Sequence, residues 1–321
     1  MLSRVAESVY WMSRYISRAE NVARVAGVNN QLQLQMPGLA EEQWDPMVQV
    51  TGDHAAFRAA YDGPTRSNVI EFLTFDANNP NSIVSCLTNA RENARSVREI
   101  ISSEMWEAIN TFYLFLREPG ARSRALADAH AFFEHVQRSS YRIEGAKNET
   151  MEHGEAWHFS RMGQFTERGD QTTRILDTKY YLLLPSPKDV GKPVDDLQWS
   201  ALLRSASAFE AYRRTHGPVA APAVASFLLL NREFPRSVHH CAIEAQTSLH
   251  SVTGTPLRRY ANSAERALGR LVADLDYTDI ADVIRTGLHE FLDSIQNRLN
   301  GVGVEITRTF FAPPRRTDAP G

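Results

Sequence analysis

The sequence has 321 residues, of which 43% are hydrophobic and 23% charged, and its formal net charge is −3. A chain of this size can bury a substantial core, and its near-balanced charge argues against a nucleic-acid surface, which needs a concentrated basic face. It has no long apolar run, its first residues include Arg4, Glu7 and Arg14, and it has two cysteines. We therefore expect a cytoplasmic protein without a membrane span, a disulfide framework or a cysteine-rich zinc site.

The apolar pattern of the first 75 residues is helical. It predicts a first helix over residues 1 to about 35, ended by Met36-Pro-Gly38, because proline and glycine terminate helices. Residues 41–61 form a second helical segment, which Asp62-Gly-Pro64 interrupts, and residues 68–75 a short apolar helix.

The clearest pattern follows, where apolar residues recur at intervals of three and four from Ile83 to Leu116. It predicts one long central helix, stopped by Glu118-Pro-Gly120. A further helix over about 122–143 closes this part of the chain, and the polar residues 144–154 are the best linker candidate.

A repeat divides the chain. Met12, Tyr15, Arg18, Glu20 and Arg24 have counterparts 150 positions later in Met162, Phe165, Arg168, Asp170 and Arg174, and Gln43-Trp44 recurs 155 positions later as Gln198-Trp199. We therefore predict an all-α bundle of two duplicated halves, residues 1–150 and 151–300, related by a pseudo-twofold axis.

The last part of the second half predicts helices at about 256–273 and 277–299, with Asn300-Gly301 as the stop. Residues 301–321 are expected to form a C-terminal arm, extended over 302–311 and disordered from Pro313.

Charged residues in the two similar blocks define the candidate site. Arg18 and Arg168 lie at the edge of an apolar helical face, where a guanidinium must find acceptors. Glu104 and Asn93 are possible acceptors. The candidate general bases are Glu20, Glu92 and Glu104, and the candidate substrate-binding residues are Arg18, Asn21, Arg24, Asn93, Arg168, Asp170, Arg174 and Arg236. The alternative interpretation is a structural seam of salt bridges.

Other chemistry is less well supported. Glu155 and His158 have the spacing of a di-iron helical motif, but the required second motif is missing, so we expect no metal. Cys86 and Cys241 occupy repeat-related positions and are expected to be small core residues. The sequence has no phosphate loop, nucleotide fingerprint or ordered Ser/His/Asp set, and we expect no cofactor.

The block Leu2-Ser-Arg-Val-Ala-Glu-Ser-Val-Tyr-Trp-Met-Ser-Arg-Tyr-Ile-Ser-Arg-Ala-Glu-Asn-Val-Ala-Arg24 resembles the alpha-E domain family, a bacterial family of unknown function. The resemblance continues through Asn81-Ser-Ile83, Ala90-Arg-Glu-Asn-Ala-Arg95, Ser103-Glu-Met-Trp106, Glu167-Arg168, Asp170 and Phe234-Pro-Arg-Ser237. It departs at Gly169-Asp-Gln171. The resemblance implies an all-α protein encoded beside, or fused to, circularly permuted ATP-grasp ligases, in a system that modifies peptides by amide ligation.

Three functions follow from these patterns. The first is an accessory subunit that docks an ATP-grasp ligase and positions a peptide or other carboxylate-bearing substrate. The second is a helical enzyme of the same pathway that uses the Glu/Arg site. The third is a structural homodimer, in which the arginines find all of their partners internally.

Overall fold

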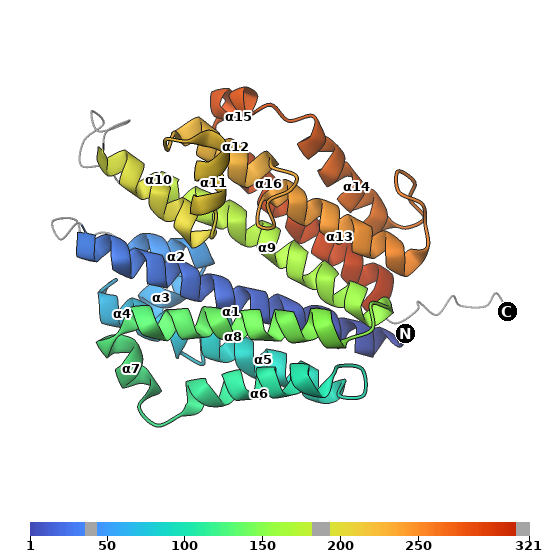
Figure 1. The fold of residues 1–321 in the computed structure, drawn as a ribbon, viewed down its shortest axis with the longest axis horizontal. Coiled ribbons are helices and arrows are strands. Elements are labelled where there is room, and N and C mark those ends of the chain that lie inside the picture. Colours follow the sequence, from blue (N-terminus) through green and yellow to red (C-terminus); the bar gives the residue numbers. More distant parts are fainter. Residues whose placement is uncertain (36–43, 182–192, 313–321) are drawn as a thin grey trace.

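The computed structural model describes residues 1–35, 44–181 and 193–312. These residues form sixteen α-helices and a closing π-helical turn, and none of them lies in a strand (Figure 1). The all-α prediction is therefore confirmed. Among the described residues, no helix combines the length and apolar character that a membrane crossing requires.

Two long helices, α1 (Ser3–Gln35) and α9 (Glu155–Tyr181), lie side by side through the middle of the molecule (Figure 1). Their backbones approach closely, because a Cβ at Gly163 would lie 2.3 Å from the carbonyl oxygen of Tyr10. The hydroxyls of Ser13 and Ser160 form a hydrogen bond of 2.6 Å across the same interface. Small residues at the crossing therefore allow the two helices to pack tightly.

The remaining helices surround this pair. Helix α1 packs against α5 and α8, and α9 packs against α13 and α16. The first set is α2 (Asp45–Thr51), α3 (His54–Ala60), α4 (Arg66–Thr74), α5 (Ile83–Ser96), α6 (Ser103–Arg117), α7 (Ala121–Ala127) and α8 (Ala129–Thr150). The second set is α10 (Pro193–Ser205), α11 (Phe209–His216), α12 (Ala221–Leu230), α13 (Val238–Thr253), α14 (Ser263–Asp276), α15 (Ile280–Thr286) and α16 (Leu288–Ile306).

The two sets follow in the same order and make corresponding contacts. Helices α4 and α12 begin 155 positions apart, and so do α5 and α13. The contacts of α5 with α6 and of α6 with α8 have counterparts in those of α13 with α14 and of α14 with α16.

The predicted long central helix is wrong. The chain leaves the helical path between α5 and α6, and the Ser102 hydroxyl caps α6 by accepting from the Met105 N–H at 3.1 Å. The apolar spacing continues through the break, since Val97 and Ile101 are buried there. Periodicity alone could not detect the break, because the buried residues continue the apolar spacing across it.

The predicted stop at Asn300-Gly301 and the extended arm over residues 302–311 are also wrong. Helix α16 continues to Ile306, and residues Thr307–Phe311 form the π-helical turn. Buried Val302, Ile306 and Phe311 explain the continuation, and the Phe311 ring lies 5.4 Å from that of Tyr10 on α1. Residues 313–321, predicted to be disordered, lie outside the described residues.

Candidate functional site

A buried carboxylate joins the two central helices. Glu167 on α9 has no exposed side-chain surface and accepts from two α1 arginines that lie one helical turn apart. Arg14 Nε donates to Glu167 Oε2 at 2.8 Å, and Arg18 donates through Nε to Oε1 at 2.7 Å and through Nη2 to Oε2 at 3.0 Å. The Arg18 pair is bidentate, an arrangement that fixes the plane of the guanidinium.

The charges of this cluster stabilise one another. Burial raises the pKa of Glu167, but the positive charges of Arg14 and Arg18 outweigh burial and bring the pKa far below its usual value. Burial lowers the pKa of each guanidinium, but Tyr10 and Glu167 together raise the pKa of Arg14 by more, and Glu167 does the same for Arg18, so that both stay charged. The carboxylate therefore holds two permanent cations in fixed positions.

Neutral side chains extend the cluster on both sides. Gln171 Nε2 donates to Glu167 Oε1 at 2.9 Å, and its Oε1 accepts from Asn21 Nδ2 at 2.6 Å. Arg18 Nη1 donates to Asn81 Oδ1 at 2.7 Å, and Asn81 Nδ2 donates to Asp53 Oδ1 at 2.9 Å. The loop before α5 is thereby tied to the interface between α1 and α9.

A polar cavity of about 220 Å³ adjoins this cluster. It is lined by Arg14, Arg18, Val22, Thr51, Asn81, Asp170, Gln171, Arg174 and Asn300. These residues come from α1, α2, the loop before α5, α9 and α16. The cavity therefore presents three guanidiniums to whatever enters it.

Arg174 and Asp170 form the second charged pair of the cavity. Arg174 Nε donates to Asp170 Oδ2 at 2.8 Å, while the described residues provide no hydrogen-bond partner for Asp170 Oδ1. Burial raises the pKa of Asp170, and the positive charge of Arg174 only partly offsets this effect. These two residues lie four positions apart on α9 and form an ion pair in a largely buried setting.

Glu20 lies in a separate buried cluster. Its Oε1 accepts from Arg24 Nη2 at 2.7 Å and from Arg236 Nη2 at 2.6 Å, and Arg24 also donates to Ser207 and Tyr141. Burial raises the pKa of Glu20, but Arg236, Arg24 and Arg168 together lower it to about 2. Two arginines thus fix this carboxylate in its ionised form.

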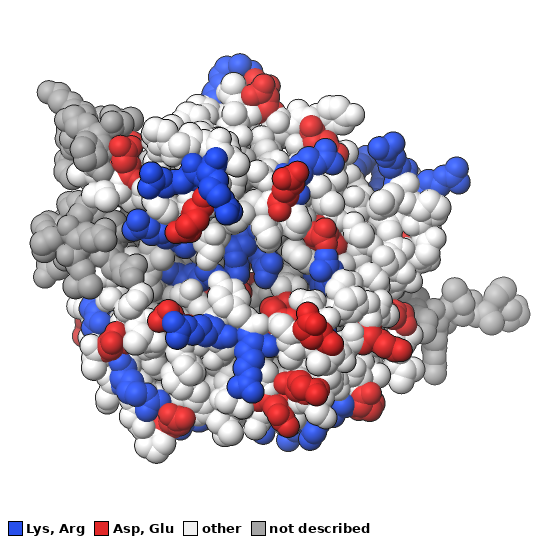
Figure 2. All heavy atoms as spheres, in the orientation of Figure 1, with Lys and Arg blue, Asp and Glu red and all other residues white. Residues whose placement is uncertain are grey.

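Basic side chains are also visible at the boundary between the two sets of helices. Figure 2 shows lysine and arginine atoms recessed in a hollow between the α8 part of the surface and the part formed by α10–α13. Arg24 and Arg236 bridge this boundary, since Arg24 on α1 reaches Ser207 after α10 and Arg236 before α13 reaches Glu20 on α1.

The other predicted carboxylates do not join these clusters. Glu92 is exposed on α5 and pairs with its neighbours Arg91 and Arg95, and Glu104 is exposed in the first turn of α6. Placing Glu104 and Asn93 opposite Arg18 was wrong, because Glu167 and Asn81 accept from it instead. The break between α5 and α6 explains the error, since positions 93 and 104 belong to different helices.

Arg168 has a different environment from Arg18. Its Nη1 donates to the Pro235 carbonyl at 3.5 Å, and its buried Nε has no hydrogen-bond partner among the described residues. The two arginines therefore differ in their hydrogen-bond partners, although they occupy repeat-related positions. Position 17, which corresponds to Glu167, is a serine and supplies no carboxylate.

Sequence reasoning missed the central role of Glu167. The profile of the Alpha-E family, described as a predicted alpha-helical domain with a conserved ER motif, matches residues 1–311. The chain belongs to the Alpha-E family. It contains two Glu-Arg dipeptides, Glu167-Arg168 in α9 and Glu265-Arg266 in α14. Glu167-Arg168 supplies the carboxylate that joins α1 to α9. This dipeptide is the feature of the sequence from which Glu167 could have been recognised.

Relatives of this Alpha-E chain include uncharacterized proteins of Mycobacterium bovis and Mycobacterium tuberculosis. Each is 25% identical over 338 residues, an alignment that covers 97% of this chain and 37% of the relative. The chain thus spans well under half the length of these proteins. No solved structure matches the Alpha-E chain.

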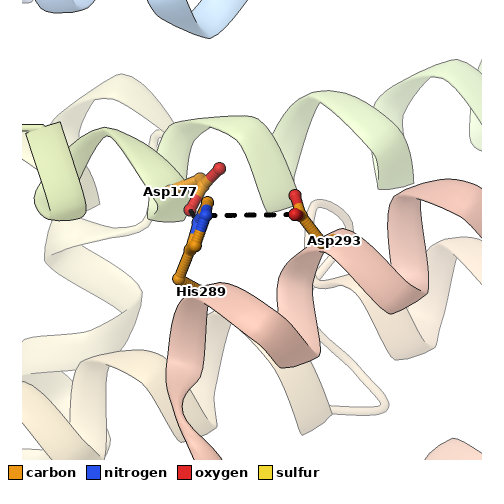
Figure 3. Close-up of side chains that lie close together, drawn as sticks. All are labelled: Asp177, His289 and Asp293. Atoms are coloured by element: carbon orange, nitrogen blue, oxygen red, sulfur yellow. Dashed lines mark hydrogen bonds and ion pairs between the residues drawn. The ribbon is translucent and has the colours of Figure 1, made fainter.

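One group of side chains in the Alpha-E fold has the composition of a metal site. The ligand atoms of Asp177 on α9 and of His289 and Asp293 on α16 all lie within 4.8 Å of one another (Figure 3). His289 Nδ1 lies 2.6 Å from Asp177 Oδ1, and this hydrogen bond raises the pKa of His289. A metal would have to displace the shared proton, so the geometry fits an ion pair better than a preformed metal site.

The two cysteines of the Alpha-E chain are core residues, as predicted. Both thiols are fully buried, and burial raises the pKa of each to about 12. Cys86 Sγ lies 3.8 Å from the Pro80 carbonyl oxygen and Cys241 Sγ lies 3.7 Å from that of Pro235. Neither is placed or ionised to act as a nucleophile.

Proposed function

We propose that this Alpha-E chain is an accessory, substrate-positioning component of an ATP-grasp amide-ligase system, and that it binds a carboxylate-bearing ligand in the cavity between α1 and α9. The observation that carries the proposal is the set of three guanidiniums that line the cavity, two of them held in place by fully buried Glu167. Guanidiniums fixed in advance recognise carboxylates without a further cost of ordering side chains.

The environments of the carboxylates favour binding over catalysis. A general base works best when its pKa lies near the working pH, whereas Glu20 is held at about 2 by its arginines. Glu92 and Glu104 are exposed outside the cavity. The enzyme alternative would instead use Asp170, which lines the cavity and whose pKa burial raises.

The length of the relatives supports an accessory role. This chain covers 37% of the mycobacterial relatives, so that in them the equivalent segment is joined to a longer polypeptide. A domain that occurs within a longer chain commonly acts together with its neighbours. The identity of that neighbour as an ATP-grasp ligase rests on the family resemblance.

We also infer that residues 1–150 and 151–300 arose by duplication and are related by a pseudo-twofold axis. The shared 155-residue spacing of α4 with α12 and of α5 with α13 supports this origin. Superposition of the two halves, helix by helix, tests it. Unrelated paths of α2–α8 and α10–α16 would contradict the duplication.

Ligand binding is tested by isothermal titration calorimetry with glutarate, a simple dicarboxylate. We expect Arg174→Gln to weaken glutarate binding at least about tenfold, because each tenfold change needs only about 1.4 kcal/mol. Arg138→Gln is the matched control, since Arg138 is an exposed α8 residue paired with Glu134. Equal weakening by both substitutions would contradict the proposed site.

The proposed partner is tested separately by co-expression and affinity capture with an ATP-grasp ligase encoded beside this chain. We expect a complex that survives purification, and ATP turnover by the ligase that changes when the Alpha-E chain is added. A ligase that neither binds the chain nor changes its rate would contradict the accessory role.

A further inference from the structure

We propose that the cavity between α1 and α9 recognises a free acidic α-amino acid, a ligand with one ammonium and two carboxylates. This inference rests on the proposed function, because it names the class of carboxylate ligand that the same cavity takes. Three features of the cavity lead to it: an acceptor without a donor, an unbalanced charge, and the size of the space.

Asp170 supplies the acceptor. The residue is 7% exposed and lines the cavity, and one of its oxygens accepts from Arg174 while the other has no hydrogen-bond donor among the described residues. Buried polar atoms in folded proteins are nearly always paired. A ligand ammonium would supply the missing donor and would place its positive charge beside a carboxylate.

The charges at the cavity favour a ligand that is negative overall. The residues that line the cavity contribute the three permanent positive charges of Arg14, Arg18 and Arg174 and the single carboxylate of Asp170. A simple anion would match the guanidiniums but leave Asp170 without a donor. An acidic amino acid satisfies both requirements, because its net charge is negative and it still carries an ammonium group.

The guanidiniums retain the capacity to bind a ligand carboxylate. Arg174 uses Nε for Asp170, and its two terminal nitrogens have no hydrogen-bond partner among the described residues. The side chains of Arg14, Arg18 and Arg174 are 12%, 20% and 24% exposed, so that solvent, and hence a ligand, can reach them.

The size of the cavity favours a single residue. Its volume of about 220 Å³ lies below the range of roughly 300–1,000 Å³ that is usual for pockets holding larger ligands. Hydrogen-bonding groups on several sides of this space come from Thr51 on α2, Gln171 on α9 and Asn300 on α16. A space of this size accommodates a single amino acid.

The test is isothermal titration calorimetry on the full chain with L-glutamate, glutarate and N-acetyl-L-glutamate. Glutarate lacks the nitrogen, and the N-acetyl compound lacks its charge. We expect L-glutamate to bind at least about tenfold more tightly than either. In Asp170→Asn this preference should fall to near one, because L-glutamate loses the carboxylate partner of its ammonium while glutarate binding is retained or strengthened. Asp170→Glu should retain the preference.

Each other outcome has a definite meaning. Glutarate that binds the wild-type chain as tightly as L-glutamate would overturn ammonium recognition and leave the proposed carboxylate site intact. A chain that binds neither compound would overturn both proposals.

L-Glutamic acid α-amide, which mimics the first residue of a peptide, distinguishes a free amino acid from a peptide N-terminus as the ligand. If it binds as tightly as L-glutamate, the free amino acid is overturned in favour of a peptide N-terminus. Circular dichroism establishes that each variant is folded.

Discussion

Arg18 and Arg168 occupy equivalent positions in two similar sequence blocks, but among the described residues only Arg18 donates a hydrogen bond to a buried carboxylate. The difference arises on the facing helix, where the residue 150 positions before Glu167 is Ser17. A guanidinium at a helix interface could be predicted to need acceptors, but its acceptor could not, because that residue lies 149 positions away in the sequence. The hydrogen-bond partners of one side chain are thus decided by the identity of a residue far away in the sequence.

At the residue scale, Glu167→Gln should lower the free energy of unfolding by about 3–5 kcal/mol, the usual cost of breaking a buried ion pair by removing one partner. The substitution leaves Arg14 and Arg18 charged, partly buried and without the carboxylate to which both of them donate. Urea denaturation followed by circular dichroism measures the change. Glu92→Gln is the matched control on an exposed residue, with an expected effect within about 0.5 kcal/mol. Equal effects of the two substitutions would contradict the role of Glu167.

A second prediction at this scale concerns pH. Arg236 and Arg24 hold the pKa of Glu20 at about 2 in the folded chain, below its value near 4.3 in an unfolded chain. A depressed carboxyl pKa stabilises the fold above the unfolded pKa, and this contribution disappears as the pH falls through the folded value. We expect Glu20 to contribute about 3 kcal/mol at pH 6 that is lost progressively between about pH 4.5 and pH 2.

Unfolding free energies of the wild-type chain and of Glu20→Gln, measured from pH 6 to pH 2, test this expectation. The difference between the two proteins should shrink as the pH falls, because the protonated carboxyl of Glu20 and the amide that replaces it in the variant are both neutral. A difference that stays constant over this range would contradict the depressed pKa.

At the scale of elements, the contact between α1 and α9 depends on a position without a side chain. A Cβ at Gly163 would lie 2.3 Å from the Tyr10 carbonyl oxygen, and backbone cannot move aside as a flexible side chain can. The sequence shows Gly163 within an amphipathic segment, where glycine weakens a helix. The need for glycine at position 163 becomes visible only when α1 is packed against α9.

Gly163→Ala should therefore lower the free energy of unfolding by at least about 2 kcal/mol, because the added methyl group forces the two helices apart. Gly145→Ala is the control, since a Cβ at this α8 position would meet no described atom within 4 Å. There the better helix propensity of alanine should raise stability by up to about 1 kcal/mol. Thermal unfolding of both variants measures these changes in stability. A Gly163→Ala variant as stable as the wild-type chain would contradict the close approach of the two helices.

At the scale of the whole molecule, the half that contains α1–α8 and the half that contains α9–α16 meet through α1 and α9. The apolar faces of α1 and α9 and the charge of Glu167 are buried partly against the opposite half. Each half by itself would expose this surface, and Glu167 would lose both of its arginines. The interface therefore belongs to a single folding unit rather than to two independent domains.

We expect fragments 1–152 and 153–321, divided in the short link between α8 and α9, to be unfolded or insoluble when produced separately and to form a one-to-one complex when co-expressed. Size-exclusion chromatography and circular dichroism measure this. A full chain cleaved at a protease site inserted in the same link is the control and should stay folded. Cooperative unfolding of fragment 1–152 alone would contradict the single unit.

The sequence by itself determined the helical class, the extent of α1, the buried cysteines and the position of charged residues beside an apolar face. These properties follow from helical periodicity, which is local and readable from neighbouring residues. Tertiary structure alone decided that Glu167 accepts from Arg14 and Arg18, that α5 and α6 are separate, and that five segments enclose one cavity. The physical reason is that a local pattern shows which face of a helix is buried, but not which distant side chain will pack against it.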